Sequence, residues 1–302
     1  MEAELVRGIP FYGIPCERLR RSLSLSNLRI PFAVMRGVRE AREILEEEKP
    51  DFVFSKGGFV AFPVCVAASM LKIPLFLHES DLTAGLVNRL TARYARLCFT
   101  AFRETAERLP RGVWVGTPIR ESATVQGRKK RGFSKRKPTV LVMGGSSGAA
   151  RLNALTVSAL PLLEDFRVLH ITGRGKGSLR AGRGYYPYEF VQDMGALYAE
   201  ADVAVSRAGS NALAELMCAG VPTLAVPLPS GRGDQKQNAA YYAALGAIRT
   251  VPEEELTEKK LLEEVRLLKD GAADFRRAMQ DVCRLKSAAR IADEIIREIG
   301  CL

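Results

Sequence analysis

The chain has 302 residues, of which 47% are hydrophobic and 26% charged, a composition that indicates a globular protein and excludes a disordered one. No apolar run reaches the roughly 18–20 residues of a membrane span, and the first residues lack the basic and apolar regions of a secretory signal. The formal net charge of +11 favours anionic partners, such as an anionic membrane surface or an anionic substrate. Because no nucleic-acid-binding module is recognisable, we expect no nucleic acid partner.

Six cysteines are scattered along the chain without a CxxC pair. Most lie in apolar segments, and we interpret them as small buried hydrophobic residues in a reducing compartment. They are Cys16, Cys65, Cys98, Cys218, Cys283 and Cys301. With no metal-ligand spacing and only two histidines, the sequence predicts neither a metal site nor a cofactor.

In the first half of the chain, short apolar runs alternate with helical patterns. We predict helices over 37–48, 60–71 and 83–94, and strands over 51–55, 74–78, 97–101 and 113–116. Strands that are apolar throughout are typical of a parallel sheet that helices cover on both faces. The right-handed crossover between parallel strands then favours a doubly wound sheet.

Residues 120–137 break this pattern with glycine, serine and charge, and we place a linker there. Its segment RKKRGFSKRK, residues 128–137, carries seven basic residues. Such a run is either a solvated linker or a surface that faces an anionic membrane. A second basic stretch, residues 18–36, interleaves arginines with large apolar residues. It predicts docking on an anionic membrane surface, with an ordinary core helix and solvated arginines as the alternative.

The alternation of strands and helices starts again after the linker. We predict strands over 140–143, 168–172, 189–191, 203–206, 223–226 and 248–251, and helices over 151–162, 211–219, 236–245 and within 257–299. The chain is therefore expected to form two similar α/β domains, over 1–119 and 138–302, joined by the linker 120–137. Ligands of such sheets bind at the carboxyl ends of the strands.

Two loops in the second half are the strongest signs of a phosphate site. TVLVMGGSSGAARLN (139–153) and VAVSRAGSNALAELMCAGVPTLAVP (203–227) each run from a strand through glycines and small hydroxyl residues into a helix. Glycines let the backbone approach a phosphate, and the N–H groups of the helix start point at it. Ser146 is expected to hydrogen-bond a diphosphate or to cap its helix. Glu215 is expected to accept hydrogen bonds from ribose hydroxyls, with an exposed helix glutamate as the alternative.

Polar residues elsewhere extend this prediction. Asp234, Gln235 and Asn238 open a further helix and suit sugar hydroxyls, although Asp234 also fits a helix cap. Arg120 follows a predicted strand, and we expect it to pair with a diphosphate or, alternatively, to form a surface salt bridge. His170 lies inside a predicted strand, where we expect a hydrogen-bonded core residue.

The segment HESD, residues 78–81, ends a strand at the edge where doubly wound sheets place active sites. Glu79 and Asp81 are therefore candidate proton acceptors for an attacking hydroxyl group. For Glu79 the alternative is a helix cap or a structural hydrogen bond.

Six motifs, by their order and spacing together, are specific for one family. They are SKGGFVAFPV at 55–64, HESDLTAGLVNRL at 78–90, VGTPIR at 115–120, GGSSGAARLN at 144–153, SRAGSNALAE at 206–215 and RGDQKQNA at 232–239. Over nearly its whole length the chain resembles the peptidoglycan N-acetylglucosaminyltransferases of the MurG type. The resemblance implies a GT-B fold of two Rossmann-like domains and an inverting, metal-independent transfer of GlcNAc from UDP-GlcNAc. The implied acceptor is the muramyl C4 hydroxyl of undecaprenyl-linked lipid I, and the enzymes are peripheral at the cytoplasmic face of the cell membrane.

The resemblance also implies donor contacts for residues of this chain. Ser146 would contact the diphosphate, Val191 the uracil edge through its backbone, and Gln235 the sugar. Arg120 would contact the donor, and Asp81 occupies a donor-contact position where the family often has asparagine. The phosphate and ribose would be held by Ser210, Asn211, Ala212, Leu213, Ala214 and Glu215, with Glu215 on the ribose.

The chain departs from the family at its start. Family members begin with a strand and a GGTGGH-like loop whose histidine is a proposed base, whereas this sequence opens at MEAELVRGIPFYG. The first domain is therefore expected to be truncated at its N-terminus, to fold poorly and to hold the acceptor loosely, because the first strand of a doubly wound sheet is central. Two further interpretations stay open, a non-catalytic UDP-sugar-binding remnant and a related GT-B transferase with another acceptor. An in-frame GGTGGH motif upstream of Met1 would indicate a start-site error.

Overall fold

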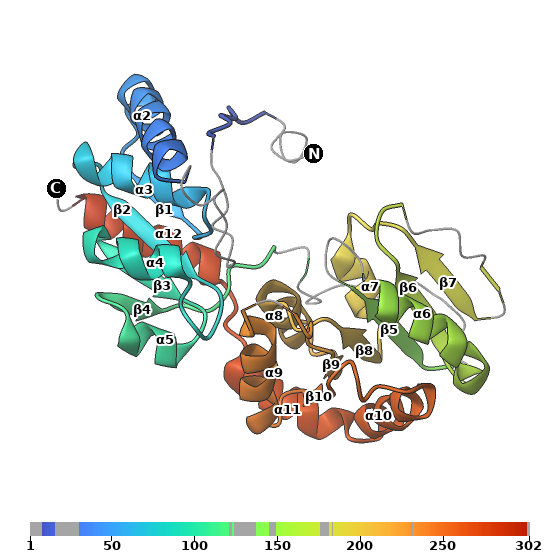
Figure 1. Cartoon of the computed structure of the whole chain (residues 1–302). Helices are drawn as coiled ribbons and strands as arrows, with labels where there is room; N and C mark the ends of the chain where they lie inside the picture. The colour runs from blue at the N-terminus through green and yellow to red at the C-terminus, as the bar shows by residue number, and fades with distance from the viewer. Residues whose placement is uncertain are drawn as a thin grey trace. The chain divides into compact units, whose positions relative to one another are not determined.

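The computed structural model describes residues 8–15, 30–120, 123, 137–144, 149–175, 181–182, 184–230 and 232–300, which form two compact units with one parallel sheet each (Figure 1). The first unit spans the chain up to Ser80, Ala84–Val115 and the chain from Ile291 onward. The second unit spans Asp81–Thr83 and Gly116–Arg290. This division differs from the expected domain boundaries, because residues from 291 onward belong to the first unit and the change of unit falls after Val115.

The first unit is built on a four-stranded parallel sheet with the strand order β1–β2–β3–β4. The strands are β1 (Val53–Ser55), β2 (Leu75–Glu79), β3 (Leu97–Thr100) and β4 (Gly112–Trp114). Its helices are α2 (Ile30–Glu48), α3 (Ala61–Met70), α4 (Leu86–Thr91), α5 (Arg103–Arg108) and, from residue 291 on, α12 (Ser287–Gly300), with a 3-10 turn at Ala92–Tyr94. The predicted strands and helices of this half are confirmed with shifted ends, and α5 was not predicted. α2 begins at Ile30 rather than at residue 37, with Pro31 in its first turn, where proline is tolerated.

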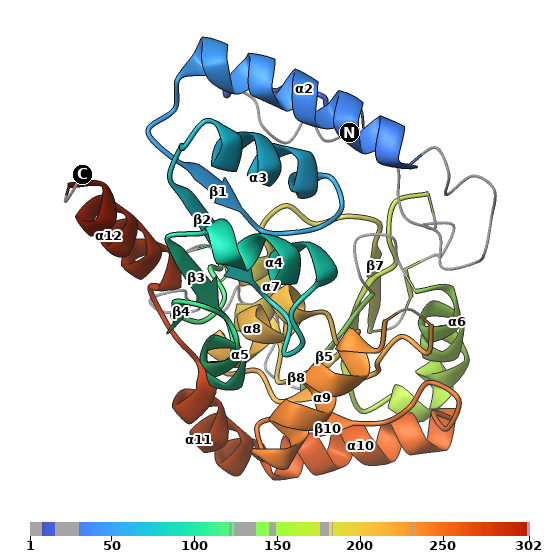
Figure 2. The ribbon, with the colours of Figure 1, turned by 60° about the vertical axis from the view of Figure 1, so that its left-hand side comes forward.

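Helices cover both faces of this sheet. On one face, Leu75 of β2 packs in a cluster with Ala41 of α2 and Cys65 of α3, and α2 lies against α3 (Figure 2). On the other face, Phe76 of β2 packs in a cluster with Ile291 of α12. Successive side chains of a strand point to opposite faces, so neighbouring residues of β2 fill separate cores. The predicted parallel sheet with cover on both faces is confirmed.

The edge strand β1 is buried on one face only. Val53 and Ser55 are buried, whereas Phe52 and Phe54 are each 37% exposed. In the part of the chain that the structure describes, β1 pairs with β2 alone. The prediction of a strand buried on both faces is therefore wrong for this segment.

The second unit is built on a six-stranded parallel sheet with the strand order β10–β9–β8–β5–β6–β7. The strands are β5 (Thr139–Met143), β6 (Arg167–Ile171), β7 (Tyr185–Tyr188), β8 (Val203–Ser206), β9 (Thr223–Ala225) and β10 (Arg249–Thr250). The helices are α6 (Ala150–Ala159), α7 (Met194–Glu200), α8 (Ser210–Cys218), α9 (Asp234–Ala244), α10 (Glu258–Asp270) and α11 (Ala272–Val282), with a 3-10 turn at Leu160–Leu163. The order changes direction at β5, which is the switch point of a doubly wound sheet.

Alternate residues of the central strand β5 belong to two cores. Val140 and Val142 pack in a cluster with residues of α6 and α10, and Leu141 and Met143 pack in another with Tyr198 of α7. All five residues of β5 are buried as a result. The predicted doubly wound α/β domain is confirmed. Among the helices of the described ranges, none is long and apolar enough to cross a membrane.

One strand of the second sheet lies elsewhere than predicted. β7 comprises Tyr185–Tyr188, whereas the sequence predicted a strand over 189–191. Pro187 lies inside β7, and a proline, which has no N–H for the ladder, makes such a segment look like a loop. β7 is the last strand in the sheet order, and an edge strand tolerates proline.

The described cysteines fall into two groups. Cys65 and Cys98 are buried free thiols, as predicted. Cys218 and Cys283 form a disulfide, so their interpretation as unpaired buried residues is wrong. They lie 65 positions apart in the sequence, and no local pattern reveals such a pair. The predictions for Cys16 and Cys301 fall outside the described residues.

Candidate functional site

The candidate site lies at the carboxyl edge of the second sheet. The strands β5, β7, β8 and β9 run parallel, so the segments that follow them leave the sheet at the same edge. These segments carry, in chain order, Ser146, Val191, Ser210 and Gln235. Ser146 lies outside the described residues, and the structure places the other three.

The start of α8 has the features of an anion site. Gly209 is its N-cap residue, and the hydrogen bond from Leu213 N to Gly209 O measures 3.0 Å. As in any α-helix, the amides before Leu213 have no acceptor within the helix. The first turn carries no acidic side chain, so its own side chains do not neutralise the positive end of the helix dipole.

The residues of α8 that were predicted to hold phosphate and ribose differ in exposure. Leu213 and Ala214 are buried in the core, so they cannot offer their side chains to a ligand. Ser210 is also buried, Asn211 is exposed and Glu215 is half-buried. A ligand can therefore contact this helix at its first turn and at Glu215.

A buried tyrosine holds the carboxylate of Glu215. The hydroxyl group of Tyr198 donates a hydrogen bond to Glu215 Oε2 at 2.7 Å. Burial, reinforced by the negative charge of Glu215, raises the pKa of the Tyr198 phenol, so this group stays a protonated donor. The contact orients Glu215 as an acceptor at the surface of α8. Sequence reasoning missed Tyr198, because a buried aromatic residue in a helix gives no signal of a polar role.

Val191 lies between β7 and α7. Asp193 caps α7 by accepting a hydrogen bond from Ala196 N at 3.3 Å. Because Tyr198 of the same helix binds Glu215, α7 connects the segment of Val191 with the Glu215 carboxylate. The predicted contacts to uracil and to ribose thus depend on one short helix.

Gln235 lies in the first turn of α9. Its Oε1 accepts a hydrogen bond from Leu228 N at 3.0 Å, which braces the loop between β9 and α9. Gly233 is the N-cap residue with a φ of 85°, a left-handed conformation that favours glycine. Arg232 Nε donates to Asp234 Oδ2 at 2.8 Å. The helix cap is therefore Gly233, and the alternative that Asp234 caps α9 is wrong.

Asp81 is bound to α9 within the second unit. Asn238 Nδ2 donates to Asp81 Oδ1 at 2.9 Å, and Leu82 N donates to Asn238 Oδ1 at 3.0 Å. Arg232 Nη2 lies 3.9 Å from Asp81 Oδ2. These contacts hold Asp81 beside the start of α9, and its roles as donor contact and as proton acceptor stay predictions.

Glu79, in the first unit, has the contacts of a structural residue. It is buried, and its Oε2 accepts hydrogen bonds from Gly85 N and Asn88 Nδ2, both at 2.8 Å. Gly85 is the N-cap residue of α4, so these contacts fit the alternative of a helix-capping glutamate. Its role as a proton acceptor stays a prediction.

Arg120 is exposed at the surface of the second unit. Its carbonyl oxygen accepts a hydrogen bond from Ala123 N at 2.9 Å, which forms a turn at the end of the VGTPIR motif. The expected contact of its guanidinium group with a diphosphate stays a prediction.

Arg207, inside the SRAGS loop, forms a buried ion pair that sequence reasoning missed. It is 7% exposed, its Nη2 donates to Glu253 Oε1, and its Nη1 donates to Val226 O at 3.3 Å. Glu253 is also 7% exposed. The ion pair joins the loop after β8 to the segment after β10, and the hydrogen bond to Val226 joins it to the segment after β9. These two contacts fix the loop that leads into α8. An arginine within a loop of small residues is the one sign in the sequence of such a buried ion pair.

A cavity of about 380 Å³ lies beside Glu253. It is lined by residues of α6 and α10, including Arg151, Ser158 and Glu258. None of the residues that we predicted to bind a nucleotide sugar lines it. We therefore place the candidate site at α8 and not in this cavity.

Comparison with known proteins identifies the family. The C-terminal domain of glycosyltransferase family 28 matches residues 139–295, and the N-terminal domain of the same family matches residues 1–100. The chain belongs to glycosyltransferase family 28. The region 139–295 includes β5 through most of α12 and thus the loops and helices at the carboxyl edge of the second sheet.

Two similar proteins carry the same name. A protein of Shouchella clausii named UDP-N-acetylglucosamine–N-acetylmuramyl-(pentapeptide) pyrophosphoryl-undecaprenol N-acetylglucosamine transferase is 41% identical over 313 aligned residues, which cover 99% of this chain and 88% of that protein. A protein of the same name from Staphylococcus haemolyticus is 40% identical, with 93% of this chain and 83% of that protein covered. The resemblance to transferases of the MurG type is therefore confirmed.

Solved structures give the same fold. The crystal structure of MurG from Acinetobacter baumannii matches with a TM-score of 0.73 and 26% identity, covering 98% of this chain and 88% of that one. The calicheamicin glycosyltransferase CalG4 matches with a TM-score of 0.67 at 16% identity, covering 94% and 82%, a likeness of fold alone. The predicted GT-B fold with two Rossmann-like parallel sheets is confirmed.

Proposed function

We propose that this chain transfers GlcNAc from UDP-GlcNAc to the muramyl C4 hydroxyl of undecaprenyl-linked lipid I, which forms lipid II for peptidoglycan synthesis. The observation that carries the proposal is the 41% identity, over 99% of the chain, to a transferase of that name. The site supports it, because an anion-binding helix start and an oriented carboxylate lie on the same helix, α8.

In this proposal the second unit binds the donor. The first-turn amides of α8 and the positive helix end stabilise the negative charge that develops on the leaving diphosphate. Glu215, oriented by Tyr198, accepts hydrogen bonds from the ribose hydroxyls. Val191, Gln235 and Arg120 contribute the uracil, sugar and phosphate contacts named above, and Ser146 contributes a further diphosphate contact.

The reaction is a displacement at the anomeric carbon. The acceptor hydroxyl attacks, the bond to the diphosphate breaks with inversion, and a proton leaves the attacking oxygen to a base. Glu79 and Asp81 are the proposed acceptors of that proton. The side chain of Asp81 is 29% exposed, whereas Glu79 is only 6% exposed, which favours Asp81 of the two.

Replacing Glu215 with alanine tests the donor site and the function together. We expect UDP to bind about 5- to 150-fold more weakly by calorimetry, which is roughly 1–3 kcal/mol for the loss of charge-assisted hydrogen bonds. Glu263→Ala is the matched control, because Glu263 is an exposed glutamate of α10 in the same unit.

The same proteins are assayed for GlcNAc transfer from UDP-GlcNAc to lipid I. Wild type and Glu263→Ala should form lipid II, and Glu215→Ala should do so with a lower kcat/KM. Equal UDP affinity of Glu215→Ala and wild type would refute the ribose contact. UDP binding by the wild type without any transfer would favour a non-catalytic UDP-sugar-binding protein.

We further propose that the chain associates peripherally with the cytoplasmic face of an anionic membrane. The basic stretches 18–36 and 128–137 motivated this, and most of both lies outside the described residues. The described start of α2 supports it, because Phe32 and Met35 are 74% and 69% exposed. Apolar side chains exposed next to basic residues suit insertion at a charged lipid surface.

Replacing both Phe32 and Met35 with serine should weaken binding to vesicles that contain anionic lipid by about tenfold or more, because two large side chains no longer enter the interface. Sedimentation with vesicles measures this, and binding of the wild type should also weaken as salt rises. Leu267→Ser is the control, since Leu267 is a 51% exposed residue of a helix in the second unit. Equal binding of wild type to neutral and anionic vesicles would count against the electrostatic contribution.

A further inference from the structure

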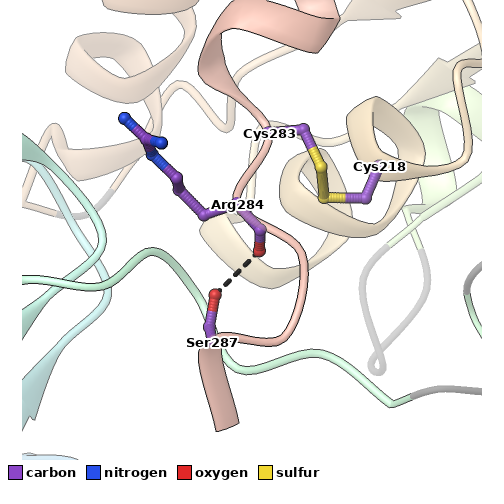
Figure 3. Close-up of a disulfide and its surroundings, with 4 residues drawn as sticks. All are labelled: Cys218, Cys283, Arg284 and Ser287. Atoms are coloured by element: carbon purple, nitrogen blue, oxygen red, sulfur yellow. Dashed lines mark hydrogen bonds between the residues drawn. A yellow bond between two sulfur atoms is a disulfide. The ribbon is translucent and has the colours of Figure 1, made fainter. Parts of the chain in front are cut away.

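The disulfide between Cys218 and Cys283 lies inside the second unit (Figure 3). The Cα atoms of the two residues are 5.3 Å apart, a usual separation for a disulfide. Cys218 is the last residue of α8, and Cys283 directly follows α11. The bond therefore joins the helix of the candidate donor site to the segment that leads into α12.

This pair is more accessible than the other described cysteines. Cys218 and Cys283 are each half-buried, whereas Cys65 and Cys98 are fully buried. Burial raises the pKa of both free thiols, that of Cys98 to about 11, and the thiolate is the form that reacts. Among the cysteines that the structure places, Cys218 and Cys283 are thus the ones that a small thiol or disulfide can reach.

The disulfide ties the last residue of α8 to the residue that follows α11. A hydrogen bond from Arg276 Nε of α11 to Gly220 O, just after α8, at 3.1 Å also joins these elements, and the two helices pack against each other. Glu215 lies less than one turn before Cys218 in the same helix. When the disulfide opens, α8 keeps its packing against α11 and this hydrogen bond but loses its covalent attachment, so the position of the helix is less restricted.

The segment after Cys283 packs closely against Gly116. Ser287 Oγ donates to Arg284 O at 2.8 Å, which closes a turn at the start of α12 (Figure 3). Gly116 has a φ of 90°, and a Cβ atom there would lie 2.5 Å from Arg284 Cβ and 2.8 Å from Ser287 Oγ. The chain passes between the units directly before Gly116 and directly after Arg290. Within the second unit, the disulfide thus joins α8 to the segment after Cys283, which packs against Gly116.

We propose that Cys218 and Cys283 form a reversible thiol–disulfide site that exchanges with low-molecular-weight thiols and disulfides, and that the oxidised form binds the nucleotide donor more tightly. The coupling to the donor rests on the proposed function, because it needs α8 to be the donor-binding helix. The oxidised form holds α8 in one position before the donor arrives, and such preorganisation lowers the cost of ordering on binding.

Oxidation of the two cysteines by a small disulfide proceeds in two steps. The thiolate of one cysteine attacks a sulfur atom of a small disulfide, forms a mixed disulfide and releases one small thiolate. The second cysteine thiolate then attacks the protein sulfur of the mixed disulfide, forms the Cys218–Cys283 bond and releases the second small thiolate. The two protein thiols are oxidised by two electrons, and the small disulfide is reduced to two thiols. Excess small thiol drives the reverse sequence.

The experiment equilibrates the full chain with glutathione and glutathione disulfide at a series of ratios. Alkylation of free thiols followed by mass spectrometry measures the fraction of the Cys218–Cys283 disulfide. We expect the fraction to rise and fall reversibly with the ratio, while Cys65 and Cys98 stay unlabelled in the folded protein. The oxidised form should melt about 5–15 °C above the reduced form, because the bond spans 65 residues and restricts the unfolded chain.

Calorimetry with UDP then compares the two forms. The dissociation constant should be about three- to tenfold larger for the reduced form, which is the size of effect expected from ordering one helix end. The double variant Cys218→Ser/Cys283→Ser should bind UDP like the reduced wild type and should not respond to glutathione disulfide.

Three results would overturn the proposal. One is a pair that stays reduced at every glutathione ratio, and another is a disulfide that no excess of glutathione opens in the folded protein. The third is an equal UDP affinity of the oxidised and reduced forms, which removes the coupling to the donor. If neither form bound UDP, the proposed donor site would fail instead, and the alkylation and melting measurements would still decide the exchange by themselves.

Discussion

Replacing Arg207 with methionine is expected to lower the free energy of unfolding by about 3–5 kcal/mol. Arg207 and Glu253 are each 7% exposed and form an ion pair. Removal of the guanidinium group leaves the Glu253 carboxylate buried without its charge partner, and an uncompensated buried charge is strongly destabilising. Urea denaturation of wild type and variant measures the change.

The double variant Arg207→Met/Glu253→Leu separates the cost of the orphaned carboxylate from the loss of the pair itself. Because neither charge is then buried, we expect it to recover most of the lost stability. Arg266→Met is the control, since Arg266 is half exposed and lies 3.9 Å from an exposed Asp165, and such surface pairs contribute at most about 1 kcal/mol. A single variant Arg207→Met as stable as the control would show that the buried pair does not fix the loop before α8.

The second half of the chain shows which parts of a fold a sequence predicts well. The strand predicted over 203–206 is β8 with the same bounds, because its first three residues are apolar and a loop that contains Gly209 follows Ser206. Central strands of a parallel sheet carry this signal directly. β7 escaped prediction, because its Pro187 and tyrosines lie at the edge of the sheet, where burial on both faces is not required.

The sequence predicted the residues of the candidate site that lie within one motif, but not the distant residues that hold them in place. The start of α8 and Glu215 followed from one short motif, SRAGSNALAE. Tyr198, which orients Glu215, lies 17 positions away, and Glu253, which binds Arg207, lies 46 positions away. Such partners meet only when the parallel strands bring their carboxyl ends together, so no spacing along the chain reveals them.

These supporting contacts share one consequence for the helix of the candidate site. Arg207 fixes the loop before α8, Tyr198 fixes a carboxylate in its middle, and Cys218 fixes its last residue. A helix held at its start, its middle and its end presents its first-turn amides in a defined direction. Preorganised donors of this kind are what stabilise charge that develops during a reaction.

His170 is expected to make the stability of the second unit depend on pH in the acid range. It is fully buried in β6, with Nε2 3.1 Å from Asn153 Oδ1 and Nδ1 2.9 Å from the Tyr185 hydroxyl, which confirms the predicted hydrogen-bonded core residue. Asn153 also donates to Thr172 O at 2.8 Å, so its Oδ1 is the acceptor for Nε2–H. Burial lowers the pKa of the imidazole from 6.5 to about 4, so the ring is neutral near pH 7.

The direction in which stability changes with pH depends on how many protons the folded and unfolded states bind. Between pH 6.5 and pH 4 the unfolded chain protonates His170 and the folded chain does not, so unfolding takes up a proton and stability falls as the pH falls. The contribution of His170 is complete above pH 6.5. The free energy of unfolding falls by roughly 3 kcal/mol between pH 6.5 and pH 4, and by about 2 kcal/mol between pH 7.5 and pH 5.

His170→Gln removes the titrating group, so the difference in unfolding free energy between wild type and variant should shrink by about 2 kcal/mol from pH 7.5 to pH 5. Urea denaturation at both pH values, with pH 8 as a reference where no change is expected, measures this difference. A constant difference from pH 8 to pH 5 would mean that the folded protein protonates His170 as readily as the unfolded chain does.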